Sequence, residues 1–139
     1  MLQAERDTST SAPSLPIRVL LVEDEGTVRT VAMRILQRRG FSVYVASSGE
    51  DALTMLSASG GVHVIISDVM MPGMSGLELA ERVAATSAPP PIVLMSGFAI
   101  PELDPEDLRR LAVRFLPKPF TPDELERVVR EVAAEHEER

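Results

Sequence analysis

The sequence contains no cysteine among its 139 residues. Without cysteine the chain cannot form a disulfide bond, and it cannot offer a thiolate ligand to a metal ion. Any metal site must therefore use other ligands. The absence also fits a protein of the reducing cytoplasm, and we expect a cytoplasmic location.

Positive charge is scarce as well. Lys and Arg together number 14 against 21 Asp and Glu, which gives a net charge of −7. A nucleic-acid surface needs a basic patch, so we expect no nucleic-acid partner. No apolar run in the sequence approaches the roughly 20 residues that span a bilayer, and residues 1–16 lack the apolar core of a signal peptide. We therefore expect no membrane partner.

The chain does have enough apolar residues for a core, because 45% of them are hydrophobic. A chain of this length predicts a single domain. Residues 1–16 carry Ser, Thr, Asp and two prolines but little that could be buried, which predicts a flexible lead or linker. Residues 17–139 then form the folded domain.

The most informative stretch of the sequence leads to Asp68. The segment Val62–Ile66 is short and apolar on both faces, and the turn Pro72-Gly73 follows the acid closely. This pattern predicts a fully buried strand of a parallel sheet. Because open α/β sheets bind their ligands beyond the carboxyl ends of the strands, Asp68 is a candidate reactive residue.

Apolar segments alternate with segments of helical period along the whole domain. The predicted strands are Ile17–Val22, Ser42–Ala46, Val62–Ile66, Ile92–Met95 and Ala112–Leu116. The predicted helices begin near Thr27, Ser48, Ser75, Pro105 and Thr121. This alternation at short spacing requires a parallel sheet with right-handed crossovers, so the predicted fold class is α/β, an open doubly wound sheet.

In such a sheet the carboxyl ends of all strands share one edge. The polar residues that follow the strands there are Glu23, Asp24, Asp68, Ser96 and Lys118. No glycine-rich phosphate loop follows the first strand, which argues against a nucleotide-binding or flavodoxin-type site. Neighbouring carboxylates repel one another unless a cation joins them, and their hard oxygens suit Mg²⁺. With Lys118 and Ser96 beside it, such a site can stabilise a phosphoryl group in transfer to Asp68.

These features resemble the receiver domain of two-component response regulators over residues 17 to about 135. The motifs that carry the resemblance are Glu23-Asp24, Asp68 with Met71–Gly76, Ser96-Gly97 and Lys118-Pro119-Phe120. The resemblance implies a flavodoxin-like sheet of five parallel strands in the order 2-1-3-4-5, flanked by five helices. It also implies phosphorelay signalling, either by a stand-alone regulator or by the receiver of a hybrid histidine kinase.

The resemblance implies roles for the acidic positions. Asp68 would accept a phosphoryl group from a phosphohistidine of a sensor histidine kinase or of a histidine phosphotransfer protein. Asp24 would bind Mg²⁺ directly, and Glu23 would act through a water molecule. The backbone carbonyl of Met70 would complete the protein ligands of the metal. A downstream effector protein would then respond to the phosphorylated state.

The resemblance further implies a conformational switch. Ser96 would close on the phosphoryl group, Lys118 would pair with the phosphoryl oxygens, and Phe115 would turn inward. The peptide bond between Lys118 and Pro119 would be cis. Phosphorylation need only bias two existing states that differ by a few kcal/mol.

Met70 also bears on the competing functions. A metal-dependent phosphohydrolase with an aspartyl nucleophile, of the haloacid-dehalogenase type, needs a second Asp two residues after the nucleophile, where this chain has Met70. A pseudo-receiver that only binds proteins is disfavoured by the complete set of acid, hydroxyl and lysine. We expect a signalling module that assists its own phosphorylation and dephosphorylation rather than a turnover enzyme. Since Met70 and Phe98 are apolar and border the attacking water in the family, we expect slow autodephosphorylation.

Two helices invite further expectations. Prolines confine the fourth helix to roughly Pro105–Leu111, with Asp104 as its N-cap, so we expect a remodelled surface there. The first helix carries Arg29, Arg34, Arg38 and Arg39 without an acid. Two interpretations of these arginines stay open, a solvated face or a docking face for an acidic partner surface.

Overall fold

The computed structural model describes residues 15–58, 61–97 and 105–137. Within these residues strands and helices alternate strictly. The strands are β1 (Arg18–Val22), β2 (Ser42–Ala46), β3 (Val64–Asp68), β4 (Ile92–Ser96) and β5 (Val113–Pro117). The helices are α1 (Gly26–Arg38), α2 (Gly49–Ala58), α3 (Gly76–Ala84), α4 (Pro105–Leu111) and α5 (Pro122–Glu137).

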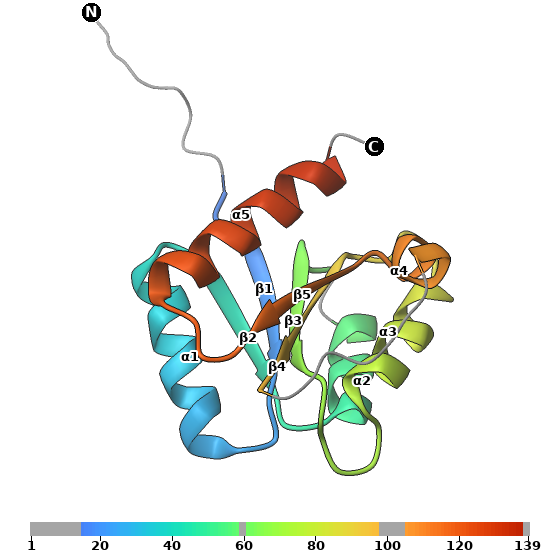
Figure 1. Ribbon diagram of the computed structural model, residues 1–139, viewed down its shortest axis with the longest axis horizontal. Helices are drawn as coiled ribbons and strands as arrows, with labels where there is room; N and C mark the ends of the chain where they lie inside the picture. Colours follow the sequence, from blue (N-terminus) through green and yellow to red (C-terminus); the bar gives the residue numbers. More distant parts are fainter. Residues whose placement is uncertain (1–14, 59–60, 98–104, 138–139) are drawn as a thin grey trace, which may run out of the picture.

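The five strands form one parallel sheet in the order β2-β1-β3-β4-β5. Helices α1 and α5 cover one face of the sheet, and α2, α3 and α4 lie on the other (Figure 1). The predicted α/β fold, doubly wound and flavodoxin-like with the order 2-1-3-4-5, is therefore confirmed. All strands point the same way, so their carboxyl ends lie at one edge of the sheet.

Each face of the sheet buries its own core, because successive side chains of a strand point to opposite faces. In β1, Val19 and Leu21 pack in the cluster on the α1 and α5 side. Leu20 and Val22 pack in the other cluster, which includes residues of α2 and α3. The central strands are buried on both sides, as their continuous apolar sequence predicts.

Several strand boundaries differ from the prediction: β1 begins at Arg18, β4 ends at Ser96, and β5 runs from Val113 to Pro117. Strand β3 runs from Val64 to Asp68 rather than from 62 to 66, because Ser67 and Asp68 still pair with Leu94 and Met95 of β4. Helix α3, predicted to begin near Ser75, runs from Gly76 to Ala84. The predicted range of α4 is confirmed, whereas its expected N-cap Asp104 lies outside the described residues. The same holds for residues 1–14, so the division at residue 16 stays a prediction.

Side chains at the helix starts bind the free backbone N–H groups there. The hydroxyl of Ser48 accepts the N–H of Asp51 at 3.0 Å. A capping box of Thr121 and Glu124 begins α5. A second capping box, formed by Ser75 with Glu78, begins α3. This box fixes the end of the loop that follows Asp68.

Candidate functional site

Asp68 and Lys118 form the centre of the site. Asp68 is the last residue of β3, and Lys118 directly follows β5. The Nζ atom of Lys118 donates a hydrogen bond to Oδ2 of Asp68 at 2.8 Å. The backbone N–H of Lys118 donates to the carbonyl of Ser96 at 2.8 Å. The structure thus joins the ends of three strands through polar contacts. Lys118 is also the only lysine in the sequence.

The loop after β3 holds Asp68 in place. The backbone N–H of Met70 donates to Oδ1 of Asp68 at 3.2 Å, so each carboxylate oxygen has one donor. The N–H of Gly76 donates to the carbonyl of Val69 at 2.9 Å. A Cβ atom at position 76 would lie 2.3 Å from the backbone oxygen of Asp68. Glycine is therefore required where α3 begins against the end of β3.

Glu23 is buried beside this pair, with only 2% of its surface exposed. Its Oε2 accepts the backbone N–H of Glu25 at 3.2 Å. Its Oε1 lies 3.9 Å from Nζ of Lys118 and has no hydrogen-bond partner in the described structure. Burial raises the pKa of the Glu23 carboxyl above its usual value, and the Glu25 N–H opposes this. The charge of Asp68 raises the pKa further, Lys118 lowers it, and Asp24 raises it.

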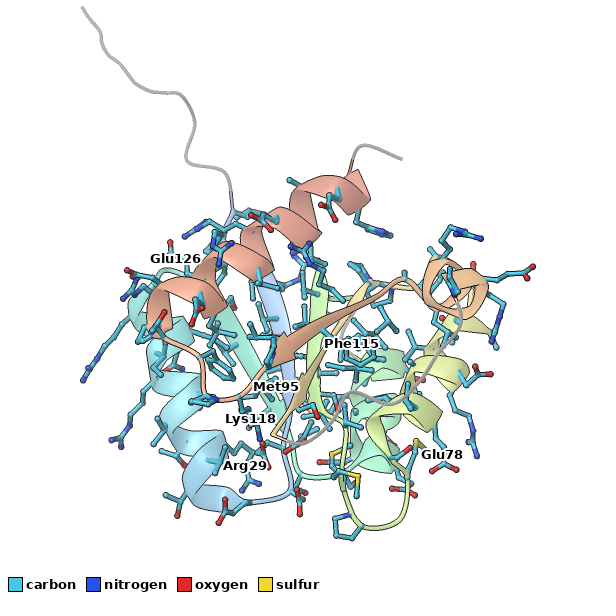
Figure 2. All side chains as sticks on the ribbon, viewed as in Figure 1. Arg29, Glu78, Met95, Phe115, Lys118 and Glu126 are labelled. Carbon is cyan, nitrogen blue, oxygen red and sulfur yellow. The ribbon has the colours of Figure 1, made fainter. Side chains whose placement is uncertain are left out.

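Arg29 has a structural role in the site that the sequence prediction missed. Its Nη1 donates to the backbone carbonyl of Glu23 at 2.8 Å. This hydrogen bond connects the start of α1 to the loop that follows β1. Figure 2 shows Arg29 and Lys118 at the same edge of the sheet. The position of Arg29 three residues after the helix start at Gly26 was the available signal, since such a side chain can reach back to the preceding loop.

The remaining predicted site residues differ in how exposed they are to solvent. Asp24 is exposed, whereas Ser96 is buried, with 5% of its surface exposed. Phe115 is half-buried and packs against the core on the α2 and α3 side. The cis peptide bond between Lys118 and Pro119 is confirmed. Phe98 lies outside the described residues.

The donor set fits Mg²⁺, although the structure does not form a closed cage. Within the described ranges no three acidic or histidine side chains stand close enough together to hold a metal ion. Mg²⁺, however, needs only one or two carboxylates and fills its other positions with water and phosphate oxygens. Oε1 of Glu23 is a buried anionic oxygen without a hydrogen bond, which a hydrated cation would satisfy. The ligand set Glu23, Asp24, Asp68 and Met70 carbonyl stays a prediction.

An apolar groove of about 630 Å³ leads to the site. It is lined by Val28, Val31 and Ile35 of α1 and by Lys118, Pro119 and Phe120. Since Lys118 also contacts Asp68, the groove is continuous with the acidic site.

The arginines of α1 do not act as one face. Arg29 binds the Glu23 carbonyl, and Arg39, just after the helix, pairs with Asp123 and Glu126. Arg34 and Arg38 are exposed and have no ion-pair partner among the described residues. Only these two remain available to a partner surface.

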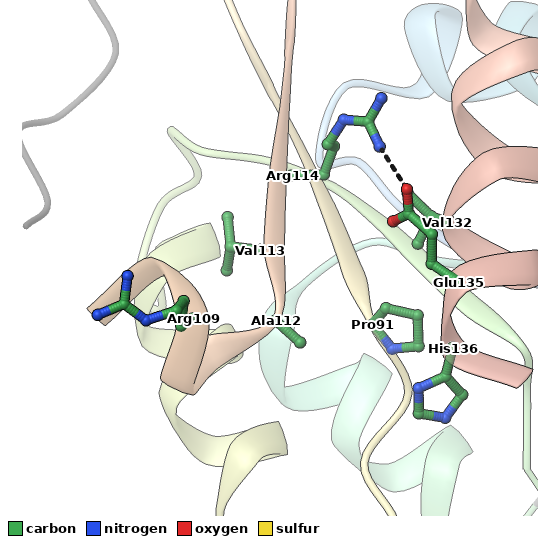
Figure 3. A pocket seen from close by; sticks show the side chains of 8 residues that line it. All are labelled: Pro91, Arg109, Ala112, Val113, Arg114, Val132, Glu135 and His136. Atoms are coloured by element: carbon green, nitrogen blue, oxygen red, sulfur yellow. Dashed lines mark ion pairs between the residues drawn. The ribbon is translucent and has the colours of Figure 1, made fainter. Parts of the chain in front are cut away.

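A second cavity, of about 280 Å³, lies at the opposite edge of the sheet (Figure 3). Pro91 and Ala112 line it, and they precede β4 and β5. Its Arg114 pairs with Glu135 at 3.7 Å and with Glu131 at 2.6 Å. The cavity therefore lies away from the residues that follow the strands, and Glu135, the one acid among its described lining residues, is already paired with Arg114.

The comparisons with known proteins identify the family of the chain. The family described as response regulator receiver domain matches residues 19–130. Sensor kinase CckA of Brucella abortus is 38% identical over 115 residues, which are 82% of this chain and 12% of that protein. Response regulator MprA of Mycolicibacterium vanbaalenii is 34% identical over 111 residues, 80% of this chain and 48% of that protein.

A solved structure shows the same fold. The chemotaxis response regulator CheY4 of Vibrio cholerae superposes with a TM-score of 0.73 at 31% identity, over 84% of this chain and 98% of that one. The chain therefore belongs to the receiver domain family of two-component response regulators. It spans about half or less of the two relatives described above. None of the described helices has both the length and the apolar character needed to cross a bilayer.

Proposed function

We propose that this receiver domain accepts a phosphoryl group on Asp68 from a phosphohistidine, in a reaction that depends on Mg²⁺. The observation that carries the proposal is the 2.8 Å contact between Nζ of Lys118 and Oδ2 of Asp68, beside the buried carboxylate of Glu23. A carboxylate at a strand end with a cation against it is placed to act as a nucleophile and to retain a transferred anion.

In the proposed transfer, a carboxylate oxygen of Asp68 attacks the phosphorus atom of the phosphohistidine. The new O–P bond forms as the P–N bond breaks, and the imidazole leaves with its electron pair. Lys118 then pairs with a phosphoryl oxygen, and the Met70 N–H keeps the carboxylate oriented through Oδ1. Mg²⁺, held by Asp24, Asp68 and the Met70 carbonyl, with Glu23 acting through water, would supply charge neutralisation for the anionic group.

The proposed response of the fold runs through β4 and β5. Ser96 ends β4, and its carbonyl already accepts the N–H of Lys118. Movement of Ser96 toward a phosphoryl group would therefore alter the contacts of β5, on which Phe115 lies. A phosphoryl group adds roughly −1.5 to −2 charges and so favours the closed arrangement. A downstream effector protein would bind that state preferentially.

The groove along α1 supports a docking mode for the donor. A histidine that reaches Asp68 over Lys118 must lie against the groove, because Lys118 lines it. We assign to the groove a helical partner surface that carries the phosphohistidine, apolar side chains and acidic residues. Val31 would contact the apolar part, and the exposed Arg34 and Arg38 would attract the acids. The relative named as a sensor kinase suggests such a donor for a cytoplasmic phosphorelay.

The decisive experiment is incubation with Mg²⁺ and a small acyl phosphate, followed by intact mass spectrometry. The natural protein should gain one phosphoryl group that is lost in alkali, and Asp68→Asn should gain none. Asp51→Asn, which changes an exposed acid of α2, serves as the matched control and should be phosphorylated normally. Phosphorylation that survives the Asp68→Asn change would contradict the proposal.

A second experiment separates docking from chemistry. Reversal of charge in Arg34→Glu/Arg38→Glu should slow transfer from a phosphohistidine donor protein but leave phosphorylation by the small acyl phosphate unchanged. Arg109→Glu/Arg127→Glu, which reverses two exposed arginines of α4 and α5, is the control for net charge. Equal transfer rates from the protein donor for both variants would contradict the docking mode.

A further inference from the structure

Met70 is an exposed thioether at the mouth of the site. The sequence contains seven methionines, and of those that the structure describes Met70 alone is exposed, with 67% of its surface open to solvent. Met71 and Met74, in the same loop, are buried, and so is Met95. A solvent oxidant therefore reaches the sulfur of Met70 most easily among these methionines.

The exposed sulfur belongs to the residue that contacts the phosphoacceptor. The backbone N–H of Met70 donates to Oδ1 of Asp68 at 3.2 Å, so the side chain of Met70 emerges two residues from the carboxylate. No apolar neighbour covers Met70 in the described structure to the degree seen for Met71 and Met74. Its thioether thus faces the same solvent that would hydrolyse an acyl phosphate.

We propose that Met70 is an oxidation site through which peroxides shorten the lifetime of the phosphoryl group on Asp68. The inference rests on the proposed function. The reaction transfers one oxygen atom from the peroxide to the sulfur: the O–O bond breaks, an S–O bond forms, the sulfide is oxidised to a sulfoxide, and hydrogen peroxide is reduced to water. Methionine sulfoxide reductase reverses the change.

The sulfoxide changes the chemistry at the mouth of the site. A thioether is a weak hydrogen-bond acceptor, so Met70 in its reduced form does little to hold a water molecule near the acyl phosphate. A sulfoxide is polar, and its oxygen accepts hydrogen bonds. One added hydrogen bond to the attacking water accelerates hydrolysis by about tenfold. Oxidation would therefore shorten the lifetime of the phosphoryl group without altering the side chains of Asp68 and Lys118.

The first part of the test locates the oxidation. The unphosphorylated protein is treated with dilute hydrogen peroxide, and peptide mapping by mass spectrometry follows each methionine. Met70 should gain oxygen before Met71, Met74 and Met95. Oxidation of the buried methionines at the same rate as Met70 would overturn the proposal at this step.

The second part measures the phosphoryl lifetime. Oxidised and untreated protein are phosphorylated with an acyl phosphate and Mg²⁺, the donor is removed, and intact mass follows the loss of the phosphoryl group. We expect loss about tenfold faster after oxidation, and recovery of the original rate after methionine sulfoxide reductase. An unchanged or longer lifetime would overturn the proposal.

Variants assign the effect to one sulfur atom. The phosphoryl lifetime of Met70→Leu is measured before and after peroxide, and only these two values are compared. They should agree. Met55→Leu, which removes a sulfur atom from α2, should keep the full response to peroxide. A response that persists in Met70→Leu would overturn the proposal. A protein that takes no phosphoryl group in any form would instead refute the proposed function, and with it the regulatory part of this inference.

Discussion

Two clusters of charged side chains in this protein differ in how their charges are balanced. The α1–α5 cluster consists of Arg39, Asp123, Glu126 and Arg130 at the surface. Arg39 pairs with Asp123 at 2.6 Å and with Glu126 at 2.9 Å, and Arg130 pairs with Glu126 at 2.9 Å. Arg130 also stacks over the ring of Phe41 at 4.7 Å. Two acids thus meet two bases, and every charge has a partner.

The edge cluster consists of Glu23, Asp24, Asp68 and Lys118. Here three acids share the single lysine of the chain, and Oε1 of the buried Glu23 has no hydrogen-bond partner. Figure 2 shows Lys118 of this cluster at the carboxyl edge of the sheet and Glu126 of the other cluster on α5. One cluster is neutral and exposed, whereas the other is negative and partly buried.

The difference in charge balance separates a cluster that can only stabilise the fold from the edge cluster, for which we propose a chemical role. Exposed, neutralised ion pairs are weak and replaceable, because solvent and salt screen them. A buried carboxylate without a full complement of partners destabilises the fold, and clusters of this kind are found mainly at functional sites. A divalent cation would reduce the excess negative charge of the edge cluster. We therefore expect mutation, metal and pH to affect the stability of the protein differently at the two clusters.

The largest effect is expected from the loss of Lys118, the cation that contacts Asp68. Lys118→Met should slow phosphorylation of Asp68 by a small acyl phosphate by about 10²–10³-fold, as for the loss of one donor to a developing anion. The rate is measured by intact mass with Mg²⁺ present. Arg114→Met, which removes a cation from β5 outside the site, is the matched control. Equal rates for the two variants would contradict a specific role of Lys118 in the phosphorylation of Asp68.

Glu23→Gln should have two effects of opposite sign. It should weaken Mg²⁺ binding about 10–100-fold, as expected for an acid that acts through water. Without metal it should stabilise the fold at neutral pH. Burial raises the folded-state pKa of Glu23 above 4.5. The contribution of this group to the stability of the fold is therefore fully present below pH 4.5 and is lost as the pH rises through the folded-state pKa.

The measurement for Glu23→Gln is thermal unfolding in chelator over a pH series, with Mg²⁺ titration in parallel. The variant should exceed the natural protein in Tm at neutral pH, and the gap should close toward acid pH. Glu25→Gln, an exposed acid of the same loop, should show neither effect. A Glu23→Gln protein that is less stable than the natural one in chelator at neutral pH would contradict the argument.

The sequence allowed the edge cluster to be placed because its members follow strands. In a parallel sheet, any residue at a strand end is brought to the same edge, so Glu23, Asp68 and Lys118 could be grouped from the order of elements alone. The contact of Lys118 with Asp68 then follows from the pairing of β3, β4 and β5. The order of the strands therefore predicted a contact between residues that lie far apart in the sequence.

The α1–α5 cluster could not be predicted in this way. Arg39 meets Asp123 and Glu126 across 84 and 87 residues of sequence, and no local pattern relates the end of α1 to the start of α5. From the sequence, Arg39 and Arg29 therefore looked equivalent to the exposed Arg34 and Arg38. Burial of Glu23 was likewise beyond the pattern, because it depends on the path of the loop after β1, where Arg29 binds the Glu23 carbonyl.

A smaller effect is expected from Arg39→Ala. The change removes both ion pairs of Arg39 in the α1–α5 cluster, so Tm should fall slightly at low salt and less at high salt, because salt screens exposed pairs. Phosphorylation of Asp68 should be unaffected. Arg38→Ala, a neighbouring arginine without an ion-pair partner among the described residues, should leave Tm unchanged. A slower phosphorylation in Arg39→Ala would show that the two clusters are coupled.

The smallest effect is a pH dependence opposite in sign to that of Glu23. Hydrogen bonds from Arg39 and Arg130 hold the pKa of Glu126 below 4.5. The ionised carboxylate therefore stabilises the fold above pH 4.5. This contribution is lost as the pH falls through the lowered folded-state pKa of Glu126. Glu126→Gln should lie below the natural protein in Tm at neutral pH and approach it in acid. Glu23→Gln should instead have a higher Tm than the natural protein at neutral pH, and this difference should shrink in acid. If both variants had a higher Tm than the natural protein at neutral pH, or both a lower one, the contrast between the clusters would be refuted.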